Sequence, residues 1–584
     1  MAARCPSHMF NLHARATRWL KVPHLERRIA LLAFVCALPS LAVGLHADDY
    51  VLHRNLREGG PLEAYTFWPR DPQAAHARLV AQRNEGGMAW WADEHPRTSY
   101  FRPLSSLSLW LDFESGLPPW WMHLENCAIY AVMVWLAVAL YRQLGLSDAG
   151  LGLAALFFGL DGAVATSVGW IAGRNTLLAP CFGLACMLVH DRSRRSRRPP
   201  LLVLSCLCFA LSLLSAELGL CTLGYLCAHA WTVDRAPLMR RALALLPYGL
   251  VTAVYLAHYV TEGYGNSGAG LNRDIATTPA LSLLLAWLEA LPLWLASTAT
   301  LPIASLQLFG PNFRLPLLVF SLAVLAVLLP LLGSRLTREP HGRMFTLGAV
   351  LSLVPLAVTL PQERLRFFVA FGVYGLLGPW VASDFDAPGR LRRTAARVVW
   401  RLHGVLLPLL FVPFLFSVVN GPGVAAAIAL DQALPRASAP TAILLNPPAF
   451  TVPWFQVAMR AFRGETAPPV YPLYAGSQPL EIQRVDDRSL ELHVARSWFA
   501  APFEQLRDLA RAPFHVGDRI DLPHVAVEVR EVNAAGAPTR ARFTFERSLD
   551  DPALAFRYWE GKNLALWKPP PVGGRAQLAA AQAL

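Results

Sequence analysis

The chain has 584 residues, of which 54% are hydrophobic and only 16% are charged. Soluble domains carry about 25% charged residues, so this composition excludes an ordinary soluble protein and predicts a polytopic membrane protein. The formal net charge of +12 would suggest nucleic-acid binding in a soluble protein. Here arginine clusters lie in short loops between apolar stretches, as is typical of cytoplasmic connections. We therefore expect membrane lipid as a partner and no nucleic acid.

Residues 1–28 are basic and are predicted to form a cytoplasmic N-terminal segment. The first apolar stretch, Ile29–Leu45, is not followed by a small-residue cleavage site, so it is interpreted as a retained span and not as a removed signal peptide. It crosses outward and places the next residues on the outer face. Nearly all basic residues are arginines, which resembles GC-rich bacterial coding. We therefore expect a bacterial inner membrane protein with a cytoplasmic N-terminus.

A long outer loop follows at residues 46–122 and is rich in tryptophan, proline and histidine. Amphipathic aromatic rings are stable at the membrane interface, so short helices lying on the bilayer are expected, for example at Leu104–Phe113. The tryptophans interpreted in this way are Trp68, Trp90, Trp91, Trp110, Trp120 and Trp121.

Apolar stretches alternate with basic loops up to about residue 420, which predicts a mostly α-helical transmembrane bundle at residues 29–420 with roughly 11–13 spans. Residues 281–309 are apolar but ambiguous. A full crossing there would put the arginines at 335, 338 and 343 on the wrong side of the membrane. We therefore expect this stretch to make no net crossing.

The composition changes after about Gly421, where proline and charged residues become common. Apolar and polar residues alternate with a period of two in Ser489–Val494, Ile520–Val529 and Ala541–Phe545, which is typical of strands. The sequence therefore predicts a small, β-rich, periplasmic domain at about residues 440–575, in which we find no catalytic constellation.

Asp48 and Asp49 follow the first span directly. Two adjacent carboxylates at a membrane surface are costly, because hydrocarbon rejects charge and like charges oppose each other's ionisation. Such a pair suits a base that takes a proton from an acceptor, a ligand for a divalent metal, or both. The structural alternative is a solvated loop or a helix cap.

Further polar segments are predicted to reach the same face. They are Asn55, Ser99–Leu104, His123–Asn126, Gly169–Leu178, Ser215–Glu217 and Glu363–Phe367. At these residues the chain resembles the GT-C superfamily of polytopic glycosyltransferases, and in particular the transmembrane O-mannosyltransferase-like proteins that carry tetratricopeptide repeats in animals. The resemblance covers roughly residues 30–380. It implies transfer of a sugar from a polyprenyl-phosphate-linked donor to a glycan or protein acceptor on the outer face.

The resemblance places the catalytic carboxylate at Asp48 or Asp49. The lipid phosphate needs cations near the interface, and guanidinium groups bind phosphate oxygens bidentately. The predicted donor-phosphate ligands are therefore Arg102, Arg174, Arg364 and Arg366, although each arginine can also be a snorkelling helix end. The predicted substrate-binding residues are Asn55, Tyr100, His123, Asn126, Trp170, Glu217 and Glu363.

The chain departs from the family pattern at several positions. Asp161-Gly162 and Thr166 stand where the family has His-Pro and Glu, Ala216 replaces a Lys, and the repeats are absent. These changes indicate a different sugar or acceptor, or lost activity. Two alternatives therefore stay open: a non-catalytic membrane scaffold or assembly protein with the same fold, and a transporter, which would carry its polar residues at mid-membrane.

Overall fold

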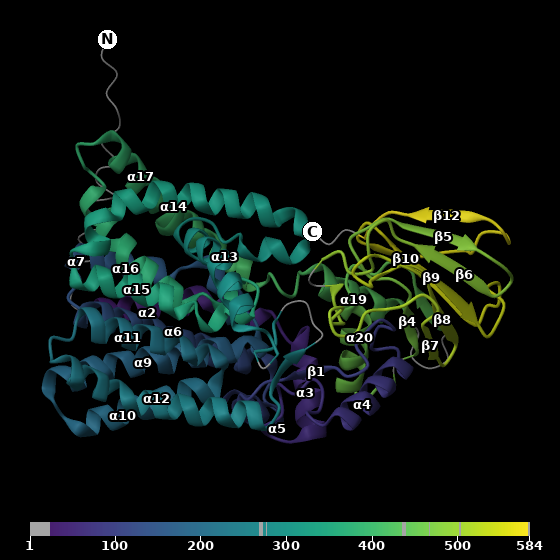
Figure 1. The fold of residues 1–584 in the computed structure, drawn as a ribbon, viewed down its shortest axis with the longest axis horizontal. Coiled ribbons are helices and arrows are strands. Elements are labelled where there is room, and N and C mark those ends of the chain that lie inside the picture. The colour runs from purple at the N-terminus through teal and green to yellow at the C-terminus, as the bar shows by residue number, and fades with distance from the viewer. Residues whose placement is uncertain are drawn as a thin grey trace, which may run out of the picture.

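The computed structural model describes residues 24–267, 272–275, 277–434, 440–466, 468–501 and 504–581. A large helical bundle lies beside a domain made of two β-sheets, and the helices α3, α4 and α5 lie where the two parts meet (Figure 1). The fold is mostly α with a β-rich C-terminal region, as predicted.

The chain forms long helices because its apolar stretches are interrupted mainly by basic loops. The α-helices of the described residues, apart from α20, are α2 (Leu25–Ala37), α3 (Asp48–Gly59), α4 (Pro72–Asn84), α5 (Pro103–Glu114), α6 (Pro119–Gln143), α7 (Asp148–Gly159), α8 (Gly162–Val168), α9 (Asn175–Ser196), α10 (Pro199–Ser215), α11 (Cys221–Thr232), α12 (Leu238–Thr261), α13 (Ala280–Ala299), α14 (Arg314–Thr337), α15 (Pro340–Ser352), α16 (Phe367–Asp384), α17 (Arg390–Arg401), α18 (Leu407–Leu415) and α19 (Pro422–Ala433). The predicted helix at Leu104–Phe113 is confirmed as α5.

Eight helical segments of the described chain are long and apolar enough to cross a membrane, and the pair α7 and α8, bent by 47°, makes up to nine. This number is below the predicted 11–13. The stretch expected to span at Ile29–Leu45 forms a helix of only 13 residues, α2, and the apolar helices α10 and α11 have only 17 and 12 residues. The chain is nevertheless an integral, multi-pass membrane protein.

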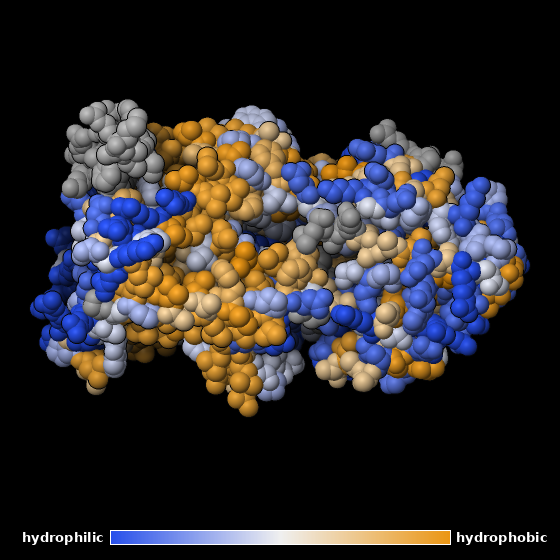
Figure 2. Space-filling model, turned by 90° about the horizontal axis from the view of Figure 1, so that it is seen from above, coloured by the Kyte–Doolittle hydropathy of each residue, from blue (hydrophilic) through white to orange (hydrophobic). Residues whose placement is uncertain are grey.

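The surface of the bundle agrees with this assignment. Figure 2 shows apolar surface over the helical part, with hydrophilic surface over the β-sheet domain and over the opposite end of the bundle. Large apolar side chains such as Val203, Leu250, Leu281 and Leu315 are exposed on this surface. Lipid tails are the solvent that such side chains require.

Helix α13 begins and ends near one other segment of the chain. Before it, Arg273 donates its backbone N–H to the carbonyl of Val358 at 2.6 Å. After it, Ser305 donates its N–H to Glu363 at 3.0 Å and Gln307 donates to the carbonyl of Pro361 at 3.2 Å. Both flanks of α13 thus contact residues 358–363, and α13 itself is long and apolar enough to span a membrane. That residues 281–309 make no net crossing stays a prediction.

The C-terminal domain contains a six-stranded sheet in the order β12-β5-β6-β9-β8-β7 and a four-stranded sheet in the order β11-β10-β3-β4. Helix α20 (Thr451–Phe462) lies between β3 and β4 along the chain. The strands are β3 (Thr441–Leu444), β4 (Val470–Pro472), β5 (Leu480–Arg484), β6 (Ser489–His493), β7 (Arg519–Leu522), β8 (Val525–Val532), β9 (Pro538–Phe545), β10 (Leu554–Glu560), β11 (Asn563–Leu566) and β12 (Arg575–Leu578).

Three strands were expected in this domain, and two of them are confirmed as β6 and part of β9. The prediction of one strand at Ile520–Val529 is wrong. That stretch folds as the antiparallel pair β7 and β8, joined at Pro523 and His524, because a proline cannot donate to a strand ladder. A further short sheet pairs β1 (Arg97–Ser99) with β2 (Gly265–Ser267) beside the bundle.

The outer loop contributes to the core of the C-terminal domain. Trp68, Leu79, Trp90 and Trp91 are buried in the same apolar cluster as the sheets, and the indole N–H of Trp90 donates to the carbonyl of Leu473 at 2.9 Å. The expectation that Trp68, Trp90 and Trp91 lie at the membrane interface is therefore wrong, because these rings are covered by the sheets.

Candidate functional site

Helix α3 carries Asp48 and Asp49 at its start and lies between the bundle and the C-terminal domain (Figure 1). On one side Val51 packs in a cluster with Val452 and Phe455 of α20. On the other side Leu52 packs with Trp170. The chain enters the helix through Ala47, whose φ of 50° lies in a region that L-residues rarely adopt. This turn places the two carboxylates at the junction of the two parts.

Asp49 is buried, and each of its two carboxylate oxygens accepts a backbone hydrogen bond. Its Oδ2 accepts the backbone N–H of His46 at 3.0 Å and its Oδ1 accepts that of Ala172 at 2.7 Å. Burial raises the pKa of Asp49 to about 7, although both hydrogen bonds and the charge of Arg174 lower it. Asp49 therefore joins α3 to the segment that follows α8.

Asp48 is half-buried, and its carboxylate makes no hydrogen bond within the described chain. Burial raises its pKa to about 6, while the positive charge of Arg364 opposes this shift and the charge of Asp49 adds to it. A carboxylate with a pKa near neutrality and no hydrogen-bond partner suits a general base.

Arg364 is the counter-charge that acts on Asp48. Its guanidinium lies 5.2 Å from the ring centre of Trp170, and its Nε donates to Gln362 at 3.1 Å. Among the described residues no carboxylate lies within ion-pair distance of it. Burial lowers the pKa of Arg364, but arginine stays charged at physiological pH. This cation is therefore available to an anionic ligand.

Arg102 lies in the same region but is paired. It donates to Glu217 at 2.8 Å and its guanidinium covers the rings of Tyr65 and Tyr100 at 4.9 and 4.4 Å. The hydroxyl of Tyr100 accepts a hydrogen bond from Asn272 at 3.0 Å, and burial raises the pKa of Tyr100 to about 12. Glu217 thus has the arginine partner that a carboxylate in an apolar hairpin requires.

Arg174 is buried among internal partners. It forms ion pairs with Asp112 at 2.6 Å and with Glu125 at 3.1 Å, and it donates to Asn126 at 2.9 Å. The amide of Asn126 donates in turn to the carbonyl of Trp170 at 3.1 Å. Arg174 and Asn126 therefore fix the backbone beside Trp170 in this structure, and the charge of Arg174 is compensated within the protein.

The positive charge of Arg366 is also compensated by a carboxylate within the protein. It forms a fully buried ion pair with Asp161, whose carboxylate also accepts the hydroxyl of Tyr374 at 2.8 Å. Glu363, three residues earlier, accepts hydrogen bonds from the backbone and hydroxyl of Ser305. Residues 363–366 are thus anchored on both sides of Arg364.

Two further predicted residues have internal partners. Asn55 is buried, donates to the carbonyl of Ala64 at 2.9 Å and accepts from Arg78 at 2.9 Å. His123 is buried, and its Nε2 lies 3.1 Å from the carbonyl of Gly44. These contacts place Asn55 and His123 in the packing around α3.

The sequence prediction missed the carboxylates that compensate the arginines. Asp112, Glu125 and Asp161 are far from their partners along the chain, so spacing gives no signal for the pairing. Their position inside apolar stretches is the signal that was available, because such carboxylates need partners. Asp161 was noted only as a departure from the family pattern.

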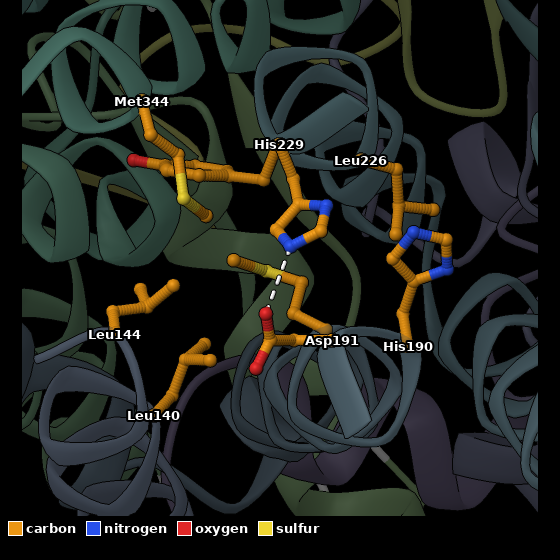
Figure 3. A pocket seen from close by; sticks show the side chains of 9 residues that line it. Leu140, Leu144, His190, Asp191, Leu226, His229 and Met344 are labelled. Carbon is orange, nitrogen blue, oxygen red and sulfur yellow. Dashed lines mark hydrogen bonds and ion pairs between the residues drawn. The ribbon is translucent and has the colours of Figure 1, made fainter. Parts of the chain in front are cut away.

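No group of three or more histidine, cysteine, aspartate or glutamate side chains that could hold a metal ion occurs among the described residues. A second polar cluster lies between α9, which carries Asp191, and α11, which carries His229 (Figure 3). There His229 and Asp191 are 2.9 Å apart beside a cavity of about 10 Å³ lined also by His190, Tyr225 and Met344. This space holds one water molecule at most, and the cluster is separate from Asp48.

No protein-family model matches the chain, and no curated protein matches it. Among solved structures, the chain is similar to ArnT from Cupriavidus metallidurans, bound to undecaprenyl phosphate and in the apo state. The sequence identity is 15% in both comparisons, and the match covers 76% of this chain and 85% or 84% of the ArnT chain. The TM-scores are 0.35 and 0.36.

Proposed function

We propose that the protein is an integral membrane glycosyltransferase that transfers a sugar from a polyprenyl-phosphate-linked donor to a glycan or protein acceptor at the outer face of a bacterial inner membrane. The observation that carries this proposal is the pair formed by Asp48 and Arg364. Among the described residues, the carboxylate of Asp48 has no hydrogen bond and the guanidinium of Arg364 has no carboxylate within ion-pair distance. Both lie where the bundle meets the C-terminal domain.

In the proposed reaction Asp48 takes the proton of the acceptor hydroxyl while the acceptor oxygen bonds to the anomeric carbon. The bond between that carbon and the phosphate oxygen breaks, and the lipid phosphate leaves with the electron pair. Arg364 stabilises the charge that develops on the phosphate, as preorganised cations do in transition states. Arg102, whose charge is shared with Glu217, is the second phosphate ligand.

The other predicted residues take supporting roles in this proposal. Asp49 positions Asp48 through its hydrogen bond to Ala172. Arg174 and Arg366 hold the segments that carry Trp170 and Arg364, because their charges are compensated by carboxylates. In this proposal Arg174 and Arg366 do not bind the donor phosphate.

The test uses full-length protein in nanodiscs with a series of radiolabelled undecaprenyl phosphohexoses and a membrane extract from a strain that lacks the gene as the source of acceptor. We expect Asp48→Asn to reduce sugar transfer at least a hundredfold, the usual effect of removing a general base. Arg364→Gln should reduce it by a similar factor, because it removes a cation that stabilises the charge of the transition state. Asp521→Asn, in an exposed ion pair with Arg519 on β7, is the matched control and should leave transfer unchanged. Undiminished transfer by Asp48→Asn would overturn the catalytic assignment.

A second candidate is a non-catalytic scaffold or assembly protein. The observation in its favour is that Arg102, Arg174 and Arg366 all have carboxylate partners within the chain. It predicts that Asp48→Asn and Arg364→Gln proteins restore every phenotype of the deletion strain. The glycosyltransferase proposal predicts that neither restores the missing glycan.

A further inference from the structure

Two buried polar atoms near the start of α3 have no partner in the described chain. They are Nε2 of His46 and Nε1 of Trp170. The side chains are 2% and 8% exposed, and their rings stack with centroids 6.5 Å apart and an angle of 28°. A buried polar group without a partner costs about 1–3 kcal/mol, so two such groups on stacked rings require an explanation.

The hydrogen bonds of His46 fix which nitrogen carries its proton. Nδ1 lies 3.2 Å from the carbonyl of Gly44 and 3.6 Å from the carboxylate of Asp49. The carbonyl of Gly44 can only accept, so Nδ1 donates to it. Burial lowers the pKa of His46, which keeps the ring neutral. Nε2 is therefore a hydrogen-bond acceptor.

Trp170 offers the complementary group, since an indole N–H only donates. Other buried indoles of the chain, such as those of Trp294 and Trp380, also lack a partner, so this feature alone is not distinctive. Trp170 differs because an unpartnered acceptor ring stacks on it and because its face carries the guanidinium of Arg364.

We propose that His46 and Trp170 form a hydroxyl-binding subsite, in which Trp170 donates to and His46 accepts from one hydroxyl group of the donor's sugar. A hydroxyl group is the common ligand group that donates and accepts at a single oxygen. The sugar of the donor is the fitting source, because it is bonded directly to the phosphate that Arg364 binds. The subsite thus rests on the proposed function and adds the residues that select the sugar.

The variants remove the hydrogen bonds of Trp170 and His46 to the sugar hydroxyl while they keep side chains that pack in the same place. Trp170→Phe removes the N–H and keeps an aromatic face for Arg364. His46→Asn keeps a donor near the position of Nδ1 and removes the acceptor, whereas His46→Gln places an amide oxygen near the position of Nε2. Trp380→Phe removes an equally buried, unpartnered indole N–H from α16 and is the matched control.

The measurement is the affinity of each full-length variant, in nanodiscs, for undecaprenyl phosphate and for undecaprenyl phosphohexoses of glucose, mannose, galactose and N-acetylglucosamine. We expect wild type to bind at least one phosphohexose more tightly than undecaprenyl phosphate. Trp170→Phe and His46→Asn should weaken that phosphohexose about tenfold and leave undecaprenyl phosphate unchanged within about twofold. His46→Gln should retain more of the preference than His46→Asn, and Trp380→Phe should change neither affinity.

Equal weakening of both probes, or no weakening by Trp170→Phe and His46→Asn, would overturn the subsite while the proposed function stands. If Arg364→Gln does not weaken undecaprenyl phosphate, or if wild type binds none of these lipids, the proposed function fails and the subsite fails with it. If wild type binds all of them without preference, the subsite alone is wrong.

Discussion

Asp49 accepts the backbone N–H of Ala172 at 2.7 Å, and this one hydrogen bond joins the start of α3 to the segment after α8, 123 residues along the chain. Asp49, the more deeply buried of the two adjacent carboxylates, therefore has a structural role. Its neighbour Asp48 has no hydrogen bond to any residue that the structure describes, and the positive charge of Arg364 acts on it. Two adjacent aspartates thus have different environments, which is how one pair of like residues can divide positioning and proton transfer.

The first prediction concerns the pH dependence of sugar transfer. The base must be ionised, and burial raises the pKa of Asp48 to about 6. Transfer should therefore fall as the pH decreases from 7 to 5, with half of the activity lost near the pKa of this group. The measurement is kcat/KM for the lipid-linked donor across this range. A rate that stays constant between pH 7 and 5 would contradict the role of Asp48.

The same pKa shift has the opposite effect on folding stability: activity should rise with pH, whereas stability should fall. The folded protein holds a proton on Asp48 up to about pH 6, whereas the usual value is 3.8. The contribution of this carboxyl group to folding therefore becomes less favourable as the pH rises through that window. Asp48→Asn should raise the apparent melting temperature at pH 7.5 by roughly 1–3 °C and should have little effect at pH 4.

The helices and their order could be predicted from apolar periodicity and from the arginine-rich loops, because these patterns are local. The contacts between Asp49 and Ala172 and between Arg102 and Glu217 agree with the prediction that these segments share one face. Which arginine keeps a free charge could not be predicted. That property depends on carboxylates such as Asp161, which the fold brings from elsewhere in the chain.

The second prediction concerns the buried pair of Asp161 and Arg366, which are 1% and 0% exposed. Removing one partner leaves an uncompensated charge in the apolar interior. Asp161→Asn should therefore destabilise the protein by about 3–5 kcal/mol, measured by denaturant unfolding in detergent. The double change Asp161→Leu with Arg366→Met should recover most of this loss, because it removes both charges.

The exposed pair of Arg519 and Asp521 on β7 is the control for this experiment. Asp521→Asn should change the unfolding free energy by about 0–1 kcal/mol, because water solvates both charges. Equal effects of Asp161→Asn and Asp521→Asn would show that the buried pair does not hold residues 363–366.

The third prediction concerns the contact between α20 and α3, the helix that carries Asp48. The ring of Phe462 lies 5.4 Å from Tyr50 and 4.8 Å from His53 between ring centres, although Phe462 is 38% exposed. Phe462→Ala should leave the fold intact and let the start of α3 shift. Small displacements of a catalytic group are costly, so we expect sugar transfer to fall about tenfold with unchanged binding of undecaprenyl phosphate.

Leu566→Ala provides the comparison for Phe462→Ala, because Leu566 is an exposed apolar residue of the same domain, at 69% exposure, and lies on β11. It should leave transfer unchanged. If Phe462→Ala also leaves transfer unchanged, the C-terminal domain does not position Asp48.

The last prediction concerns the dependence of the C-terminal domain on the outer loop. Trp90 is 1% exposed and donates to the carbonyl of Leu473, so the domain's core contains a side chain from more than 300 residues earlier in the chain. Trp90→Ala should cost about 3–5 kcal/mol through lost burial and should make residues 440–581 sensitive to protease in the full-length protein. Trp120→Ala, at a ring that is 49% exposed, should leave protease resistance unchanged. Resistance that survives Trp90→Ala would mean that the two sheets fold without the loop. Sensitivity would mean that the membrane-proximal loop and the sheets form one folding unit, which ties the position of α3 to the presence of the whole domain.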